Sequence, residues 1–115
     1  MRSLHHPKRE DLRVEAVLFA LADPVRLDIV RQLDDGHADM ACLAFELPVS
    51  KSTSTHHFRV LREAGLIRQD RHGTEIRNSL RREDLDARFP GLLAAVLGAV
   101  ADHAPTTRST GEARP

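Results

Sequence analysis

Apolar residues recur at helical spacing through the first third of the chain, in two segments separated by a proline. The first segment, from Leu12 to Ala22, predicts a helix with Asp11 available to cap its start. Asp23-Pro24 then interrupts the pattern, because the residue before a proline avoids helical geometry. Proline itself suits a first helical turn, so the sequence predicts a second helix over 24–35.

Two further helical patterns follow, joined by a short connection. The first covers 39–47, and residues 47–49, with a proline at their centre, form a tight turn. The second begins after Ser50, a good N-cap, and ends at Gly65, which suits the left-handed turn that stops a helix. Two short helices joined in this way predict a helix-turn-helix, whose second helix enters the major groove of DNA.

The spacing changes from helical to alternating after this second helix. Leu66 and Ile67 begin a predicted strand, His72-Gly73 marks a turn, and residues 74–80 alternate between apolar and polar side chains. A hairpin beside a groove-binding helix is a wing, which commonly touches phosphate or the minor groove, although a polar tip is also ordinary in hairpins without that role. The candidate DNA contacts near its tip are Arg71, His72 and Arg77.

A last helix and two terminal segments complete the predicted organisation. Residues 81–88 form a charged turn or short helix, and residues 89–103 form a helix with a broad apolar stripe. Packed with the first helix, this stripe predicts a dimer surface, with ordinary core burial as the alternative. We therefore expect one winged helix-turn-helix domain over 10–103, mainly α with a small β-hairpin (α+β), between a flexible arm at 1–9 and a disordered tail at 104–115.

Charge is distributed unevenly, although the 115 residues have no net charge. Residues 50–82 carry eight basic and three acidic side chains, a net charge of +5, while the remainder carries nine basic and fourteen acidic ones, a net charge of −5. A basic block on an acidic body is typical of modules that bind DNA. Aromatic residues make up only 3% of the chain, so the core is expected to be aliphatic, which favours an oligomer.

Side chains suited to DNA contact share one side of the second helix of the predicted helix-turn-helix. Ser52, His56 and Arg59 are spaced i, i+4 and i+7 and form one stripe, while Lys51 and Thr55 form the stripe beside it. Small hydroxyls can approach base edges closely, and lysine or arginine can reach guanine or phosphate. The alternative is a solvated helix face with a capping serine.

Three stretches together resemble the ArsR/SmtB family of bacterial winged-helix repressors: LADPVRLDIVRQL, SKSTSTHHFRVLREAGLI and the basic hairpin with its glycine turn. The likeness spans residues 14–100 and implies a homodimer that is built on the first and last helices, binds a palindromic operator and often regulates its own gene. In many members an inducer, usually a metal ion or metalloid, lowers DNA affinity. His57 matches a recurrent histidine of the family, as a structural residue or a base contact. By matching position, the groove-facing candidates are Lys51, Ser52, Ser54, Thr55, His56 and Arg59.

The family's thiolate metal site is incomplete in this sequence. The Cys-x-Cys pair that one subgroup uses for soft metals falls on Asp39 and Ala41, and Cys42 stands alone one residue away. Thiolate sites need several such ligands, so this site is not expected here. Cys42 is expected to be a small buried residue.

The family's second metal site, on the last helix, is also altered. A subgroup uses an Asp-x-His there, whereas Asp102 and His103 are adjacent in this chain. A nickel or zinc site would have to borrow ligands, for example His5 or His6 of the other subunit. A metal-responsive version of the regulator is therefore an alternative, and no cofactor is certain.

Enzymatic and membrane functions are not expected from this sequence. It has no Gly-rich phosphate loop, nucleophile elbow or paired-carboxylate motif. The most apolar run is too short for a membrane span and there is a single cysteine, so a cytoplasmic location is expected. Seven histidines leave a metal-binding or protein-interaction module as an alternative, against which the basic block argues. The sequence thus predicts a DNA-binding transcriptional repressor whose partners are double-stranded operator DNA and a second copy of the chain.

Overall fold

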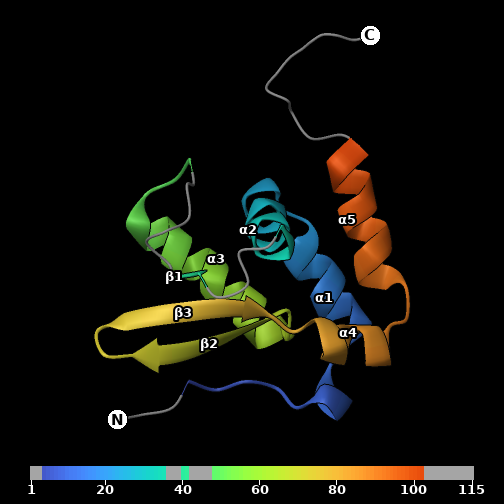
Figure 1. Ribbon diagram of the computed structural model, residues 1–115, viewed down its shortest axis with the longest axis horizontal. Coiled ribbons are helices and arrows are strands. Elements are labelled where there is room, and N and C mark those ends of the chain that lie inside the picture. Colours follow the sequence, from blue (N-terminus) through green and yellow to red (C-terminus); the bar gives the residue numbers. More distant parts are fainter. Residues whose placement is uncertain (1–3, 36–39, 42–47, 103–115) are drawn as a thin grey trace, which may run out of the picture.

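Five α-helices, one short 3₁₀ helix and three strands make up the part of the chain that the computed structural model describes, residues 4–35, 40–41 and 48–102. In chain order they are η1 (Arg9–Asp11), α1 (Val14–Leu21), α2 (Pro24–Asp34), β1 (Met40–Ala41), α3 (Lys51–Ala64), β2 (Ile67–His72), β3 (Glu75–Leu80), α4 (Arg82–Arg88) and α5 (Leu92–Asp102). Figure 1 shows the hairpin of β2 and β3 along one edge, with α1, α2 and α3 over it and α5 at the side. None of the described helices has the length and apolar character needed to cross a membrane.

Local capping chemistry sets the start of α2 and both ends of α3, and the sequence predicts the caps of α3 at Ser50 and Gly65. The Asp23 carboxylate accepts hydrogen bonds from two backbone N–H groups of the first turn of α2, which begins at Pro24. At the start of α3, the backbone N–H of Thr53 donates to Ser50 Oγ at 3.2 Å. Gly65 ends α3 with a left-handed φ of 90°. The helix predicted to enter the groove therefore has fixed ends.

The first and last helices begin later than the sequence predicts. Asp11 belongs to η1 and does not cap α1, which starts at Val14 without a side-chain cap bond. Phe89 closes α4 and does not open α5, because Gly91 takes a left-handed φ of 83° between the two helices. The last helix consequently starts at Leu92.

A strand occupies positions where the sequence predicts the start of a helix over 39–47. Met40 and Ala41 form β1, which pairs antiparallel with β3. The strand order is β1-β3-β2, so β1 gives backbone partners to the side of β3 that a two-stranded hairpin would leave open. The helix prediction is therefore wrong at Met40 and Ala41, and residues 42–47, which include Cys42, lie outside the described part.

The predicted hairpin is confirmed, and buried polar groups fasten it to α3. Its two strands pair in register from Ile67 opposite Leu80 up to the turn. Gln69 Nε2 donates to Asn78 Oδ1 at 2.8 Å, and Arg62 Nη1 of α3 donates to Gln69 Oε1 at 2.9 Å. These bonds fix the base of the wing relative to the groove helix.

Aliphatic side chains from all five described α-helices meet in one core between the helices and the hairpin. Its buried members are Leu12, Val17, Ala20, Leu21, Ile29, Val30, Leu33, Phe58, Leu61, Ala64, Leu66, Ile67, Leu85, Leu93 and Leu97. Phe58 and Leu61 of α3 both point into this core. The core holds one side of α3, and its other side faces outward.

The described part of the N-terminal arm lies beside the hairpin (Figure 1) and bonds to the folded domain. Arg62 Nε donates to the carbonyl oxygen of His5 at 3.1 Å. The backbone N–H of Gln69 donates to His6 Nε2 at 2.9 Å. Residues 5 and 6, predicted to belong to a flexible arm, are thus hydrogen-bonded to the end of α3 and to β2.

Candidate DNA-binding surface

The outward side of α3 carries most of the predicted groove contacts. The exposed side chains among them are Lys51, Ser52, Thr55, His56 and Arg59, while Ser54 is half-buried. The opposite side of the helix packs Phe58 and Leu61 into the core. Because the two sides are separated around the helix axis, the candidate contacts form a continuous polar surface on one rigid element.

Two hydroxyl groups of this surface already donate to the helix backbone. Ser54 Oγ donates to the carbonyl oxygen of Ser50 at 3.0 Å, and Thr55 Oγ1 donates to that of Lys51 at 3.0 Å. In this arrangement the hydroxyl oxygens keep lone pairs that can accept hydrogen bonds from DNA amino groups. Ser52 Oγ lies 3.3 Å from Ser50 Oγ at the start of the helix.

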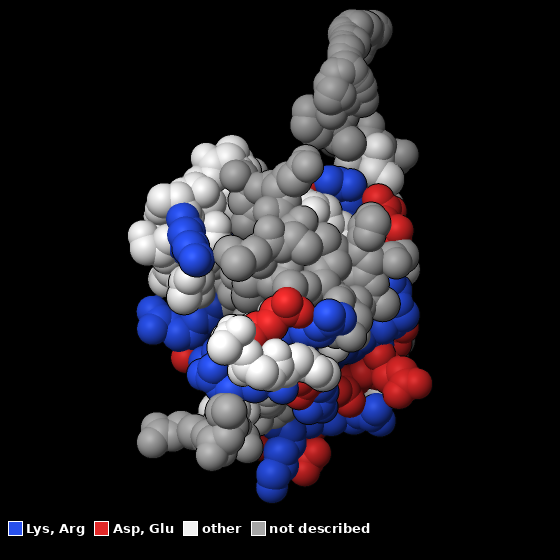
Figure 2. Space-filling view, turned by 60° about the vertical axis from the view of Figure 1, so that its left-hand side comes forward, with Lys and Arg blue, Asp and Glu red and all other residues white. Residues whose placement is uncertain are grey.

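Two cations of α3 are available for an anionic partner. Within the described ranges, neither Lys51 nor Arg59 forms an ion pair, and both are exposed. The acid of this helix, Glu63, lies at its far end, 4.0 Å from Arg62. Figure 2 shows Lys and Arg side chains along the α3 side and around the hairpin, with acidic side chains more numerous toward the opposite edge. The surface is therefore suited to a polyanion.

The three candidate residues of the wing are not equivalent. Arg71 and His72 are exposed at the end of β2. Arg77 is half-buried, its Nε lies 3.0 Å from Glu75 Oε2, and Asp70 stands directly opposite it in the hairpin. The charge of Arg77 is thus partly balanced within the wing, whereas Arg71 forms no ion pair among the described residues.

A cluster of buried polar side chains lies behind α3, and the site predicted from the sequence does not include it. His57 is 8% exposed and faces Arg26 of α2, which is 7% exposed, with His57 Nδ1 3.1 Å from Arg26 Nη1. The Asp23 carboxylate lies 3.8 Å from the same ring nitrogen. Burial disfavours the charged form of Asp23, but the hydrogen bond from the Arg26 backbone and the nearby charges outweigh it and lower the pKa of this carboxyl. Arg26 lies three and four residues before the buried Ile29 and Val30, so all three share the inward face of α2. This spacing is the signal in the sequence for a buried arginine.

Comparison with known proteins places this fold in a family. The sequence model for the bacterial regulatory proteins of the arsR family matches residues 23–69, which run from the cap of α2 into β2. The uncharacterized HTH-type transcriptional regulator YceK of Bacillus subtilis (strain 168) is 33% identical over 89 residues, covering 75% of this chain and 89% of that protein. The chain belongs to the ArsR family.

Two further relatives of this ArsR-family chain agree with that result. The HTH-type transcriptional regulator NmtR of Mycobacterium tuberculosis (strain H37Rv) is 41% identical over 68 residues, 59% of this chain and 57% of that protein. The crystal structure of the transcriptional repressor BigR from Xylella fastidiosa matches with a TM-score of 0.59 at 23% identity, over 81% of this chain and 87% of that one, and shows the shared fold. The chain is a helix-turn-helix transcriptional regulator and not an enzyme, as the sequence predicts.

The metal ligands predicted for this ArsR-family chain do not gather within the described residues. His5 is exposed, and His6 already accepts a hydrogen bond at Nε2. Asp102 ends α5, and His103 lies outside the described part. Across residues 4–35, 40–41 and 48–102, no three His, Cys, Asp or Glu side chains are placed to hold a metal ion.

Proposed function

We propose that this ArsR-family chain is a cytoplasmic transcriptional repressor that binds a palindromic DNA operator as a homodimer. In the proposed complex α3 lies in the major groove and the wing of β2 and β3 lies on the backbone or in the minor groove. The observation that carries the proposal is the outward face of α3, a helix capped at both ends. Lys51 and Arg59 are exposed there beside short hydroxyls and form no ion pair with any described residue.

Each part of the α3 surface has its own role in the proposal. Lys51 and Arg59 neutralise phosphate or reach the acceptor atoms of guanine. Ser52 and His56 lie on the same stripe as Arg59 and are short enough to contact base edges directly. Arg71 and His72 extend the contact from the wing, so the affinity should depend strongly on salt concentration.

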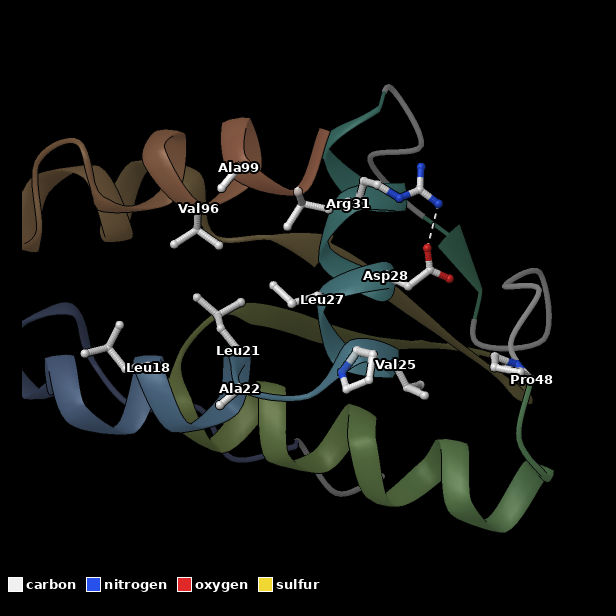
Figure 3. A pocket seen from close by; sticks show the side chains of 12 residues that line it. Leu18, Leu21, Ala22, Val25, Leu27, Asp28, Arg31, Pro48, Val96 and Ala99 are labelled. Atoms are coloured by element: carbon white, nitrogen blue, oxygen red, sulfur yellow. Dashed lines mark hydrogen bonds and ion pairs between the residues drawn. The ribbon is translucent and has the colours of Figure 1, made fainter. Parts of the chain in front are cut away.

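Apolar surface on α1 and α5 supports the homodimer. Leu18 and Phe19 of α1 are 48% and 67% exposed. An open apolar groove of about 860 Å³ lies between α1, α2 and α5, and Figure 3 shows Leu18 of α1 and Val96 of α5 facing each other across it. Exposed apolar surface of this kind is typical of an interface, because a partner removes it from water. A two-fold dimer would present two copies of α3 to two half-sites.

The experiment that tests the proposal is a DNA-binding titration followed by fluorescence anisotropy. Wild-type protein without a tag is titrated with a duplex selected from a random library and with a scrambled duplex of the same composition. Arg59→Ala and Lys51→Ala should each weaken binding to the selected duplex. Arg82→Ala is the matched control, because this exposed arginine of α4 pairs with Asp34. Wild-type affinity in both α3 variants would place the reading surface elsewhere.

The metal-responsive version of this regulator stays a prediction from the sequence. Its ligands would have to come from both subunits, with His5 or His6 of one and Asp102 and His103 of the other. The same titration tests it, first with a chelator and then with nickel or zinc. A tenfold loss of affinity, about 1.4 kcal/mol of coupling, would support a metal sensor, whereas unchanged affinity with both metals would oppose it.

A further inference from the structure

One buried arginine joins the end of α1 to α3. Arg26 Nε donates to the carbonyl oxygen of Ala20 at 2.6 Å, and Arg26 Nη2 donates to that of Phe19 at 3.3 Å. A third side-chain contact of Arg26, 3.1 Å long, joins its Nη1 to His57 Nδ1 of α3. The guanidinium carbon also lies 5.5 Å from the centre of the Phe19 ring. A single side chain therefore contacts both the proposed dimer helix and the proposed DNA-reading helix.

The geometry of these bonds restricts how α1 and α3 can be placed. A guanidinium is planar and its donors point in fixed directions, so all three acceptors must lie near its plane. Two of them are carbonyl groups of the last turn of α1, and that of Phe19 also accepts a hydrogen bond from the backbone N–H of Ala22 at 3.1 Å. Arginine can only donate, so His57 Nδ1 must be the unprotonated acceptor. A change in the angle between α1 and α3 would break at least one of these bonds.

His57 sits in the middle of the groove-facing residues along the sequence but points the other way. It follows His56 directly, and neighbouring residues of a helix point about 100° apart. A rotation of α3 that moved His57 away from Arg26 would also turn Ser52, His56 and Arg59 together. The bond to Arg26 is therefore coupled to the direction in which the whole α3 surface faces.

Apolar packing alone would not require this arrangement. Burying a guanidinium is unfavourable unless its charge and its donors are matched, and well-packed apolar residues often serve stability equally well. Here each of the three guanidinium nitrogens has one acceptor, two carbonyls and one imidazole in all, and the Asp23 carboxylate lies 3.8 Å from that imidazole. The directional bonds give the cluster a property that an apolar contact lacks, namely a single preferred rotation of α3.

We propose that Arg26 and His57 are positioning residues for DNA recognition, which hold α3 at one rotation relative to α1. The preference for the operator over other DNA depends on this pair, although both side chains are buried and neither belongs to the exposed surface. This inference rests on the proposed function and adds to it two residues that do not touch DNA.

The experiment compares three single variants and one double variant with wild-type protein. His57→Leu removes the acceptor and keeps the apolar volume, while His57→Asn keeps an acceptor where Nδ1 lies. Arg26→Lys keeps the charge and loses the planar fork. Because a single change leaves a buried polar partner unmatched, the double variant Arg26→Met with His57→Leu removes both members and keeps a foldable core. Thermal unfolding and sedimentation establish that each variant is folded and has the wild-type assembly state.

The measured quantity is the ratio of the dissociation constants for scrambled and selected duplexes. We expect His57→Leu, Arg26→Lys and the double variant to lower this ratio at least tenfold, with non-specific affinity and its salt dependence unchanged. His57→Asn should stay within about threefold of wild type, a rescue that a general packing role would not give.

Two outcomes count against the proposal in different ways. If wild-type protein prefers the selected duplex and the folded variants keep the same ratio, the positioning role is wrong and the proposed function stands. If wild-type protein itself has no preference for any duplex, the proposed function fails and this inference fails with it.

Discussion

Arg71 and Arg77 lie in the same hairpin, yet their surroundings differ enough to predict different contributions to DNA binding. Arg71→Ala should weaken binding to all duplexes and lower the slope of log affinity against log salt by about 1, because one phosphate contact is lost. Arg77→Ala should change the slope less, since its guanidinium lies 3.0 Å from Glu75 Oε2. Anisotropy titrations at several salt concentrations measure both slopes. Equal slopes for the two variants would show that the ion pair between Arg77 and Glu75 breaks when the protein binds DNA.

His6 connects the arm to the wing through a bond that requires its neutral form. Burial first, and then the charges of Arg68, Arg62 and Arg81, lower the pKa of His6 below the 6.5 of a free histidine. A histidine with a lowered folded-state pKa stabilises the fold fully above pH 6.5. This stability is lost as the pH falls from 6.5 through the folded-state value, because the unfolded chain binds the proton first.

The variant His6→Gln should reduce this dependence on pH. Glutamine can accept the bond from the backbone of Gln69 near the position of Nε2, but it does not titrate. The free energy of unfolding, measured with urea from pH 5 to pH 8, should therefore fall less steeply toward acid in the variant than in wild type. The variant His6→Ala loses both the hydrogen bond and the titrating group. It should therefore be less stable than His6→Gln at every pH, which separates the effect of the bond from that of titration. Parallel curves for wild type and His6→Gln would count against a neutral, bonded His6.

At the residue scale, local chemistry was predictable and distant contacts were not. The helix start at Pro24, the cap at Ser50 and the stop at Gly65 follow from side chains and backbone conformations within three residues of each helix end. The bond between Arg26 and His57 joins residues 31 positions apart, and only the folded arrangement brings them together. Their buried positions were encoded in helical spacing, but their pairing was not.

At the scale of elements, Gly65 governs the junction between α3 and β2. Gly65→Ala should lower the free energy of unfolding by about 2–5 kcal/mol, for two reasons. A left-handed residue with a side chain costs about 1–2 kcal/mol. In addition, an added Cβ would lie 2.1 Å from Leu12 Cδ2, and Leu12 is fully buried, so overpacking adds about 1–3 kcal/mol.

Gly73→Ala is the matched control for this change. Gly73 also has a positive φ, of 66°, but an added Cβ would meet nothing within 4 Å. Only the backbone cost applies, so Gly73→Ala should lose about 1–2 kcal/mol of unfolding free energy. Urea unfolding of both variants gives the comparison. A loss at Gly65 no larger than at Gly73 would mean that Leu12 moves aside without cost.

The elements that the sequence missed are those formed by contacts between distant segments. The alternation of residues 74–80 was enough to predict β3, because a hairpin is local. β1 is two residues long and exists through its pairing with β3, so no pattern within 39–47 could reveal it. The last helix starts late because Gly91 has a left-handed φ. The apolar pattern of residues 89–103 continues past this glycine and gave no sign of the break.

At the scale of the whole molecule, the charge pattern and the apolar pattern point to different faces. The net charge of +5 over residues 50–82 coincides with α3 and the wing, where the candidate DNA contacts are exposed. The exposed apolar side chains Leu18 and Phe19 lie on α1. A regulator that reads two half-sites needs both a polyanion-binding face and a self-association face. The sequence predicts a basic surface and an apolar surface, but only the folded structure shows which of their side chains are exposed.

The proposed dimer surface gives the last prediction. Leu18→Glu should convert the dimer to a monomer, because Leu18 is 48% exposed in the single chain and lines the groove between α1 and α5. Burying a fully exposed leucine contributes about 1.5–3 kcal/mol, and about half of that remains for the interface because Leu18 is 48% exposed. A two-fold interface counts the loss twice, so the dimer dissociation constant should rise at least about tenfold, since each 1.4 kcal/mol is a factor of ten.

Sedimentation velocity over a range of concentrations measures this change directly. Ala87→Glu is the matched control, because it adds the same charge at an exposed position of α4, outside the proposed interface. The control should remain a dimer and keep wild-type affinity for the selected duplex. Leu18→Glu should bind that duplex weakly, since each monomer reads one half-site alone. A dimeric Leu18→Glu protein with intact DNA binding would show that the subunits associate through another surface.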